Sequence, residues 1–202
     1  MRKSAIVLCI TVMITTVGFF VYCYFHFPFW NYRNTSNCEV LKHISLSQMS
    51  GYRGKQILVH RDFYPSMIKL NAIAERLNIH LILNQGYRYP GHKVKGAIVD
   101  PATFSNHQAG FAIDCNLEYE GEIYTSQDLS RKNVSRMPSA IIQFIELAKT
   151  EVDLRWGGDF TPEDPVHFDL PINLENRAEW KEAQARCKND FQHCPMIWQF
   201  WK

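Results

Sequence analysis

The sequence has almost no surplus of either charge. Its 202 residues include 22 Lys and Arg against 20 Asp and Glu, which gives a formal net charge of +2 at neutral pH. Proteins that bind nucleic acids present clustered basic faces, so this balance argues against a nucleic-acid partner. Repeats and low-complexity tracts are also absent, and 46% of the residues are hydrophobic, which excludes a disordered or fibrous chain. The length suits one globular domain.

The sequence contains no pair of cysteines separated by two residues, which is the spacing found in many structural zinc sites. Of six cysteines, Cys9 and Cys23 lie in an apolar N-terminal run, and the others are Cys38, Cys115, Cys187 and Cys194. These four allow three disulfide pairings in an oxidising compartment, or they remain buried free thiols. The simplest pairing joins Cys187 to its near neighbour Cys194 and leaves Cys38 for Cys115.

Charged residues are missing from Ala5 to Phe25, a run long enough to cross a bilayer as a helix. Arg2 and Lys3 precede it, and such cationic flanks tend to stay in the cytoplasm. The expected organisation is a cytoplasmic start (1–4), a transmembrane signal anchor in the lipid bilayer (5–25), a stem (26–40) and a domain on the periplasmic or cell-wall side (41–202). A cleaved signal peptide is the alternative, although its apolar core is usually shorter and ends in a small-x-small site.

The pattern of the remaining chain indicates the α+β class, with a small antiparallel sheet and flanking helices, because helices and strands do not alternate regularly. Helices are expected from Pro65 to Leu77, from Pro138 onward and over 174–191. A long polar loop over 85–110 is more typical of a functional segment than of an idle connection. The expected strands cover 79–83, 111–117, 123–124, 154–156 and 166–170.

Two of these strands carry groups that bind metals. Side chains alternate across a strand, so Asp114 points away from the apolar face that holds Ile113, and His167 and Asp169 point away from the face that holds Phe168. His107 comes shortly before the first of these strands. Two histidines and one carboxylate, with a fourth position open, form the ligand set of a catalytic zinc site.

Three ordered motifs then become recognisable. The pattern Ser105-x-His107-x-x-Gly110-x-Ala112-x-Asp114 is followed by Trp156-Gly157-Gly158-Asp159-Phe160 and by Asp164-Pro165-Val166-His167-Phe168. Together with Gly86-Tyr87-Arg88, they resemble the M15 family of zinc peptidases over about residues 79–170. That group contains D-alanyl-D-alanine carboxypeptidases and L-alanyl-D-glutamate endopeptidases, and the Trp-Gly-Gly-Asp-Phe element is closer to the endopeptidase branch.

The resemblance implies a zinc fold shared with D-Ala-D-Ala peptidases and hedgehog-type domains. It assigns His107, Asp114 and His167 as Zn²⁺ ligands and Asp164 as the general base, while Arg88 would face the substrate carbonyl oxygen or a carboxylate. Asp169 would orient a ligating histidine. Additional candidates for the cleft wall or for support of the ligands are Trp156, Tyr87 and Ser105.

The expected function is that of a membrane-anchored zinc peptidase acting on peptidoglycan stem peptides, of the L-Ala-D-Glu endopeptidase or D-Ala-D-Ala carboxypeptidase type. Two alternatives remain open. The domain could be a non-catalytic zinc-containing module that recognises peptides, as in hedgehog-type domains. It could instead be a phage lysis enzyme whose anchor is released from the membrane.

Overall fold

A computed structural model describes residues 2–26, 31–92 and 104–199. Parts of the expected stem (27–30) and of the expected long loop (93–103) lie outside the described residues. The first helix, α1, covers Arg2–His26. Among the described residues, no helix is both long and apolar enough to cross a membrane, so the expected span over 5–25 is not supported.

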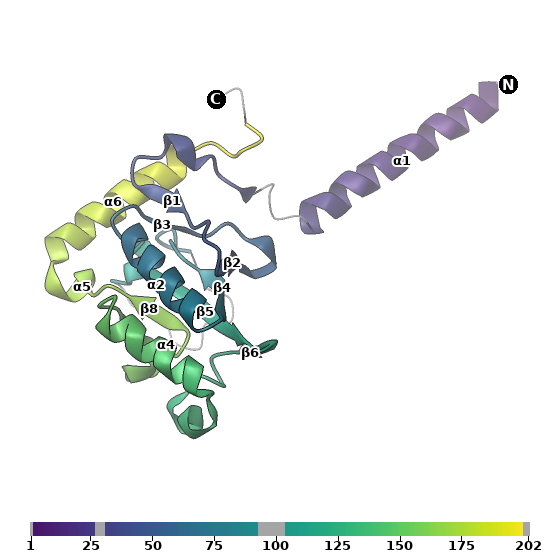
Figure 1. Cartoon of the computed structure of the whole chain (residues 1–202). Helices are drawn as coiled ribbons and strands as arrows, with labels where there is room; N and C mark the ends of the chain where they lie inside the picture. The colour runs from purple at the N-terminus through teal and green to yellow at the C-terminus, as the bar shows by residue number, and fades with distance from the viewer. Residues whose placement is uncertain (1, 27–30, 93–103, 200–202) are drawn as a thin grey trace.

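The domain is built on a sheet of six strands (Figure 1). Its strands are hydrogen-bonded in the order β2-β4-β5-β8-β7, and β6 forms a hairpin with β5. All neighbouring pairs are antiparallel except β2 with β4, which are parallel, so the sheet is mixed where an antiparallel one was expected. The bounds are β2 Met49–Gly51, β4 Ile79–Gln85, β5 Ala112–Tyr119, β6 Glu122–Tyr124, β7 Arg155–Trp156 and β8 His167–Asp169.

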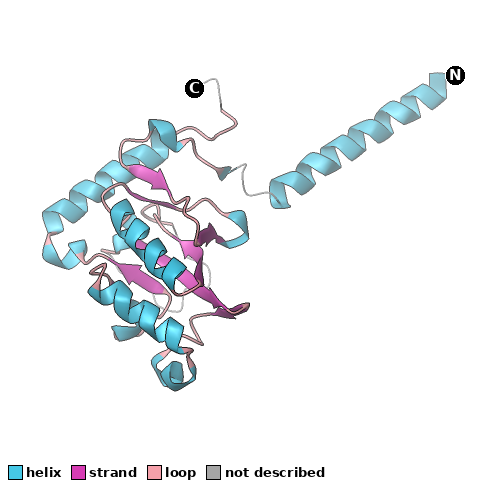
Figure 2. Cartoon of the chain, in the orientation of Figure 1, coloured by secondary structure: helices cyan, strands magenta, loops and turns pink. Residues whose placement is uncertain are grey.

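One face of this sheet packs against helices α2 (Tyr64–Arg76) and α4 (Ser139–Thr150), which lie side by side (Figure 2). The fully buried residues Met67, Leu70 and Phe144 come from these helices, and Phe144 meets Phe168 of β8 with ring centroids 6.1 Å apart. The strands contribute every second residue to the same core. The opposite face is therefore left for polar side chains.

A second, smaller layer joins the two ends of the domain. Strands β1 (Leu41–His43) and β3 (Leu58–His60) pair antiparallel, and α6 (Arg177–His193) contacts β1 and α3 (Asn106–Ala109). Asp190 of α6 accepts hydrogen bonds from the backbone of Val40 and Leu41, at 2.6 and 2.9 Å. Short helical segments complete the chain: α5 (Ile172–Glu175) and 3₁₀ turns at Thr35–Asn37, Tyr52–Gly54, Arg131–Arg136 and Gly157–Asp159.

A disulfide links Cys38 to Cys194, which confirms that the domain contains a disulfide but shows that the expected pairing was wrong. Cys187 and Cys194 are seven residues apart along and just beyond α6, so their Cα atoms are about 10 Å apart, too far for a disulfide. Cys187 is buried, and its Sγ lies 3.3 Å from the carbonyl oxygen of Ala109. Cys115 is likewise a buried free thiol, on the core side of β5.

The mixed α+β class is confirmed, and the main helices and strands begin within a few residues of their expected positions. The strands that the sequence did not indicate are β1, β2 and β3, each of three residues. Segments of this length are too short to show a recognisable period.

Candidate metal centre

Three potential metal ligands converge on the polar face of the sheet. Nε2 of His107 lies 3.1 Å from Oδ1 of Asp114 and 3.1 Å from Nδ1 of His167, and the last two atoms are 3.0 Å apart. These three residues form the group that could hold a metal ion within the described part of the chain. The structure therefore brings together the three ligands that the sequence indicated.

The strands and a short helix position these side chains. In the antiparallel pair β5–β8, Asp114 lies directly opposite His167, so their side chains emerge next to each other on one face. His107 comes from α3, which ends at Gly110 with a left-handed φ of 78°. A Cβ at Gly110 would lie 2.7 Å from the backbone nitrogen of His60, so glycine is required where the chain turns into β5.

Hydrogen bonds on the outer ring nitrogens determine the tautomer and the orientation of the two histidines. Nδ1 of His107 lies 2.8 Å from the carbonyl oxygen of Gly86, an acceptor, so Nδ1 carries the proton. Nε2 of His167 lies 3.3 Å from Oδ2 of Asp169, which again places the proton on the outer nitrogen. In their neutral forms both rings thus direct a bare nitrogen toward Asp114, as metal ligands do.

Three lone-pair donors within about 3 Å of one another require a positive charge between them. Burial would lower the pKa of His167, but its hydrogen bonds to Asp114 and Asp169 outweigh burial and raise the pKa to about 10. The pKa of Asp114 is held far below its usual range, because the two histidines outweigh its burial. Ligands of a tetrahedral Zn²⁺ lie about 3.3 Å apart, close to the observed separations, so the set fits zinc.

A network behind His167 holds that ligand in place. Arg155 donates to Asp169 from Nε at 2.9 Å and from Nη2 at 2.6 Å, and Nδ2 of Asn106 donates to the same carboxylate at 2.8 Å. Burial would raise the pKa of Asp169, but its hydrogen bonds from His167 and Arg155 hold it at about 2. The sequence indicated Asp169 for this position, whereas Asn106 and Arg155 were missed although each adjoins a recognised motif residue.

The loop before β8 brings Asp164 to the metal centre. The backbone nitrogen of Asp164 donates to the carbonyl oxygen of Gly157 at 2.8 Å, and a Cβ at Gly157 would lie 2.1 Å from the carbonyl oxygen of Asp164 and 2.9 Å from Cβ of His167. Only glycine permits this approach. Burial, followed by the negative charge of Asp114, raises the pKa of the Asp164 carboxyl, while the histidines and Arg88 oppose the shift.

Arg88 also lies next to the centre. Its backbone nitrogen donates to the carbonyl oxygen of His107 at 2.9 Å, and its Nη1 donates to Oε1 of Gln85 at 3.3 Å. Burial lowers the pKa of the guanidinium, and the charges of Asp114 and Asp164 act against that shift. A permanent cation therefore stands beside the two carboxylates.

The remaining candidates support the fold of the site. Trp156 is buried in the core, and its Nε1 donates to the carbonyl oxygen of Pro165 at 2.8 Å, which braces the loop that carries His167. Ser105 precedes α3, and its carbonyl oxygen accepts from Nε1 of Trp180 at 3.3 Å. Tyr87 lines a cavity next to the metal centre.

A family model matches the segment that contains this centre. No curated protein matches the sequence of the chain. Residues 99–170 match a family model described as D-alanyl-D-alanine carboxypeptidase, and this segment contains His107, Asp114, Asp164 and His167 but not Arg88.

Proposed function

We propose that the chain is a zinc-dependent peptidase of the M15 group that hydrolyses peptide bonds in peptidoglycan stem peptides. The observation that carries this proposal is the convergence of one carboxylate and two bare histidine nitrogens within about 3 Å. The match of residues 99–170 to carboxypeptidases supports it, because the matched segment contains all three groups.

Zinc held by His107, Asp114 and His167 would supply Lewis-acid chemistry, which makes water acidic near neutral pH and polarises a carbonyl group. Asp164 accepts the proton from the attacking water, and its raised pKa makes the carboxylate a stronger base than an exposed aspartate. Arg88 faces the developing negative charge on the carbonyl oxygen with its fixed cation. Asp169 and Arg155 keep His167 oriented throughout.

The proposal includes two candidates for the peptide bond that is hydrolysed. The L-Ala-D-Glu endopeptidase type, suggested by the Trp156-Gly157-Gly158 element, and the D-Ala-D-Ala carboxypeptidase type of the matched model both use this chemistry. The Cys38–Cys194 disulfide supports a location in an oxidising compartment outside the cytoplasm, where peptidoglycan is found.

The deciding experiment is incubation of the zinc-loaded full chain with purified peptidoglycan, followed by mass spectrometry of the released fragments. We expect defined cleavage that a chelator abolishes, and we expect the Asp164→Asn variant to retain one zinc per chain. Its kcat should fall by about 10²–10⁴-fold, because the amide cannot accept a proton. His167→Ala should instead lose both zinc and activity.

Two results would contradict the proposal. Absence of any fragment from the zinc-loaded parent chain would favour a non-catalytic module that binds peptides. An Asp164→Asn variant whose cleavage rate stays within about threefold of the parent's rate would remove Asp164 from the mechanism. The next candidate for the base would be Glu163, which forms an ion pair with Arg131.

A further inference from the structure

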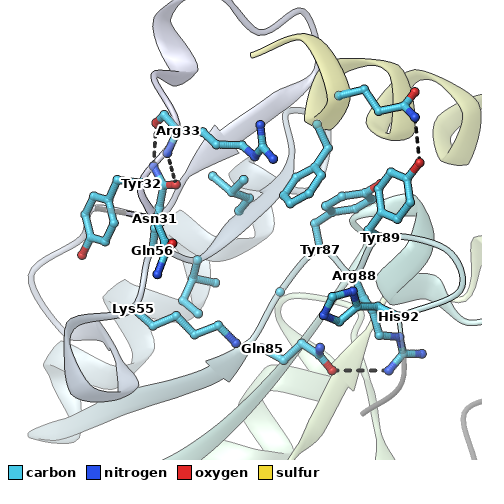
Figure 3. A pocket seen from close by; sticks show the side chains of 15 residues that line it. Asn31, Tyr32, Arg33, Lys55, Gln56, Gln85, Tyr87, Arg88, Tyr89 and His92 are labelled. Carbon is cyan, nitrogen blue, oxygen red and sulfur yellow. Dashed lines mark hydrogen bonds between the residues drawn. The ribbon is translucent and has the colours of Figure 1, made fainter. Parts of the chain in front are cut away.

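A cavity of about 540 Å³ lies beside the metal centre, and Arg88 is the one residue of its lining that the proposed mechanism uses (Figure 3). Its size is within the range of sites that bind small molecules or short peptide segments. Arg88 lines this cavity and also faces Asp114 and Asp164, so the cavity adjoins the metal centre. Burial lowers the pKa of Lys55, and the charge of the Asp114 carboxylate opposes this shift, so Lys55 also lies near the centre.

The charges around the cavity have one sign. Its lining includes Arg33, Lys55 and Arg88, and none of its lining residues is Asp or Glu. In the part of the chain that the structure describes, none of these three cations takes part in an ion pair. Figure 3 shows Arg33 near one end of the cavity, with Lys55 and Arg88 near the other.

The far wall of the cavity is aromatic. Arg33 stacks on Phe191 with 3.8 Å between its Cζ and the ring centroid, and the rings of Tyr87 and Tyr89 also pack on Phe191. The hydroxyl oxygen of Tyr87 is buried, so a ligand in the cavity does not reach it. This wall therefore offers aromatic surface beside the Arg33 cation.

We propose that this cavity binds a carboxylate carried by the peptide substrate at a distance from the scissile bond. The inference rests on the proposed peptidase function and adds a substrate class to it, namely acidic peptides. A carboxylate matches the surplus of cations, and the aromatic wall would contact the apolar part of the same residue. Its source is either an acidic residue within the peptide or the peptide's C terminus.

The two ends of the domain build the far side of this cavity. Arg33 precedes β1 and donates from Nη1 to the carbonyl oxygen of Cys194 at 2.8 Å, while Phe191 comes from the last turns of α6. The disulfide between Cys38 and Cys194 joins these same segments. Both ends lie outside the segment that matches the carboxypeptidase model, so this feature belongs to the rest of the chain.

The test measures binding separately from turnover, with the zinc-loaded full chain carrying Asp164→Asn. The probe is the stem pentapeptide L-Ala-D-Glu-L-Lys-D-Ala-D-Ala, prepared with its D-Glu carboxylate free or amidated and with its C terminus free or amidated. Calorimetry should show that one of the two amidations weakens binding by about tenfold, since hydrogen bonds to charged groups contribute strongly. The amidation that does so identifies the source of the carboxylate.

Adding Arg33→Gln and Lys55→Gln should weaken binding of the peptide with both carboxylates free by about tenfold or more and remove the discrimination. A double variant of exposed cations on α2, Lys69→Gln with Arg76→Gln, changes the net charge equally and should keep the discrimination. Because Arg33 also braces Cys194, Lys55→Gln alone provides a second probe. It should weaken binding by a few-fold without altering the circular dichroism spectrum or zinc content.

Equal binding of all four peptides, or full discrimination retained by Arg33→Gln with Lys55→Gln, would overturn the inference. These outcomes differ from a failure of the proposed function. If the parent chain cleaves stem peptides but shows no carboxylate preference, the inference fails and the function stands. If no peptide is cleaved but discrimination disappears in the double variant, the function fails and the carboxylate site stands.

Discussion

The carboxylate of Asp169 lies 3.3 Å from Nε2 of His167 and receives two hydrogen bonds from Arg155 on its other side. His167 therefore cannot rotate or change tautomer without breaking this chain of contacts. We expect Asp169→Asn and Arg155→Gln each to weaken zinc binding by about 10–100-fold, as measured by competition with a chromophoric chelator. Arg76→Gln, which removes an exposed ion pair with Glu151, is the matched control and should leave zinc affinity unchanged.

Zinc affinity that stayed within twofold of the parent in both variants would contradict a positioning role for this network. Arg155→Lys keeps the charge but loses the paired geometry, so it should recover only part of the affinity. Comparing the zinc affinities of Arg155→Gln and Arg155→Lys therefore separates the orientation of His167 from a general effect of local charge.

The stability of the metal-free protein should depend on pH in two directions. Asp169 has a folded-state pKa of about 2, below the unfolded value of about 3.9, so its contribution is present above about pH 4 and is lost as the pH falls toward 2. His167 has a folded-state pKa of about 10, above the unfolded value of about 6.5. Its contribution is therefore present below about pH 6.5 and is lost as the pH rises toward 10.

Urea unfolding of the metal-free chain between pH 2.5 and 9.5 should thus show greatest stability between about pH 4 and 6.5. The Asp169 contribution is about 2–3 kcal/mol of unfolding free energy. Zinc in the site replaces the proton on His167, so the loss above pH 6.5 should disappear in the zinc-loaded protein. Identical pH profiles with and without zinc would show that the metal does not bind at these residues.

Gly157→Ala should disrupt the metal centre by displacing the loop next to His167. The added Cβ would lie 2.1 Å from the carbonyl oxygen of Asp164 and 2.9 Å from Cβ of His167, so the loop must move. We expect a loss of about 1–3 kcal/mol in stability together with weaker zinc binding and reduced activity. Zinc content by atomic absorption and urea unfolding measure the two effects.

Gly121→Ala is a suitable control for that variant. Gly121 has a φ of +82° and open space around its Cβ position, so alanine adds backbone strain without a collision. It should lower stability by about 1 kcal/mol and leave zinc content unchanged. A Gly157→Ala protein that loses stability but keeps full zinc occupancy would show that the loop moves independently of His167.

Alkylation of the denatured, unreduced protein should label Cys9, Cys23, Cys115 and Cys187 and leave Cys38 and Cys194 unlabelled. Replacing Cys38 and Cys194 by serine should lower the free energy of unfolding by about 2–5 kcal/mol, because the bond closes a loop of 156 residues. Cys9→Ser, at an exposed position, serves as the control. A Cys187–Cys194 peptide in the tryptic digest would contradict the observed pairing.

The grouping of the three candidate metal ligands could be predicted from the sequence, because the alternation along the strands and the ordered motifs point to the same residues. Alternation along β5 and β8 placed Asp114 and His167 on the polar face, and the structure sets them opposite each other. The sequence indicated Asp169 but not its partners, because Arg155 and Asn106 reach Asp169 from a neighbouring strand and from α3. Neither residue carries a periodic signal that points to a distant carboxylate.

Features that join distant segments were predicted less well. The pairing of Cys38 with Cys194 depends on where α6 docks, and sequence proximity favoured a partner that helical geometry excludes. The parallel pairing of β2 with β4 brings Met49 opposite Leu81, across a separation that no local pattern reveals. The cavity lined by Arg33 and Phe191 was missed for the same reason.

The disulfide also determines when this domain can be completed during synthesis. Cys194 follows Cys38 by 156 residues, so a ribosome must translate that whole segment before the bond can form. The sheet can assemble around β4 and β5 earlier, while the side of the cavity that holds Arg33 and Phe191 must wait for α6. An emerging chain would therefore possess its candidate metal ligands before it possesses its full cavity, and the docking of α6 would complete the proposed carboxylate site.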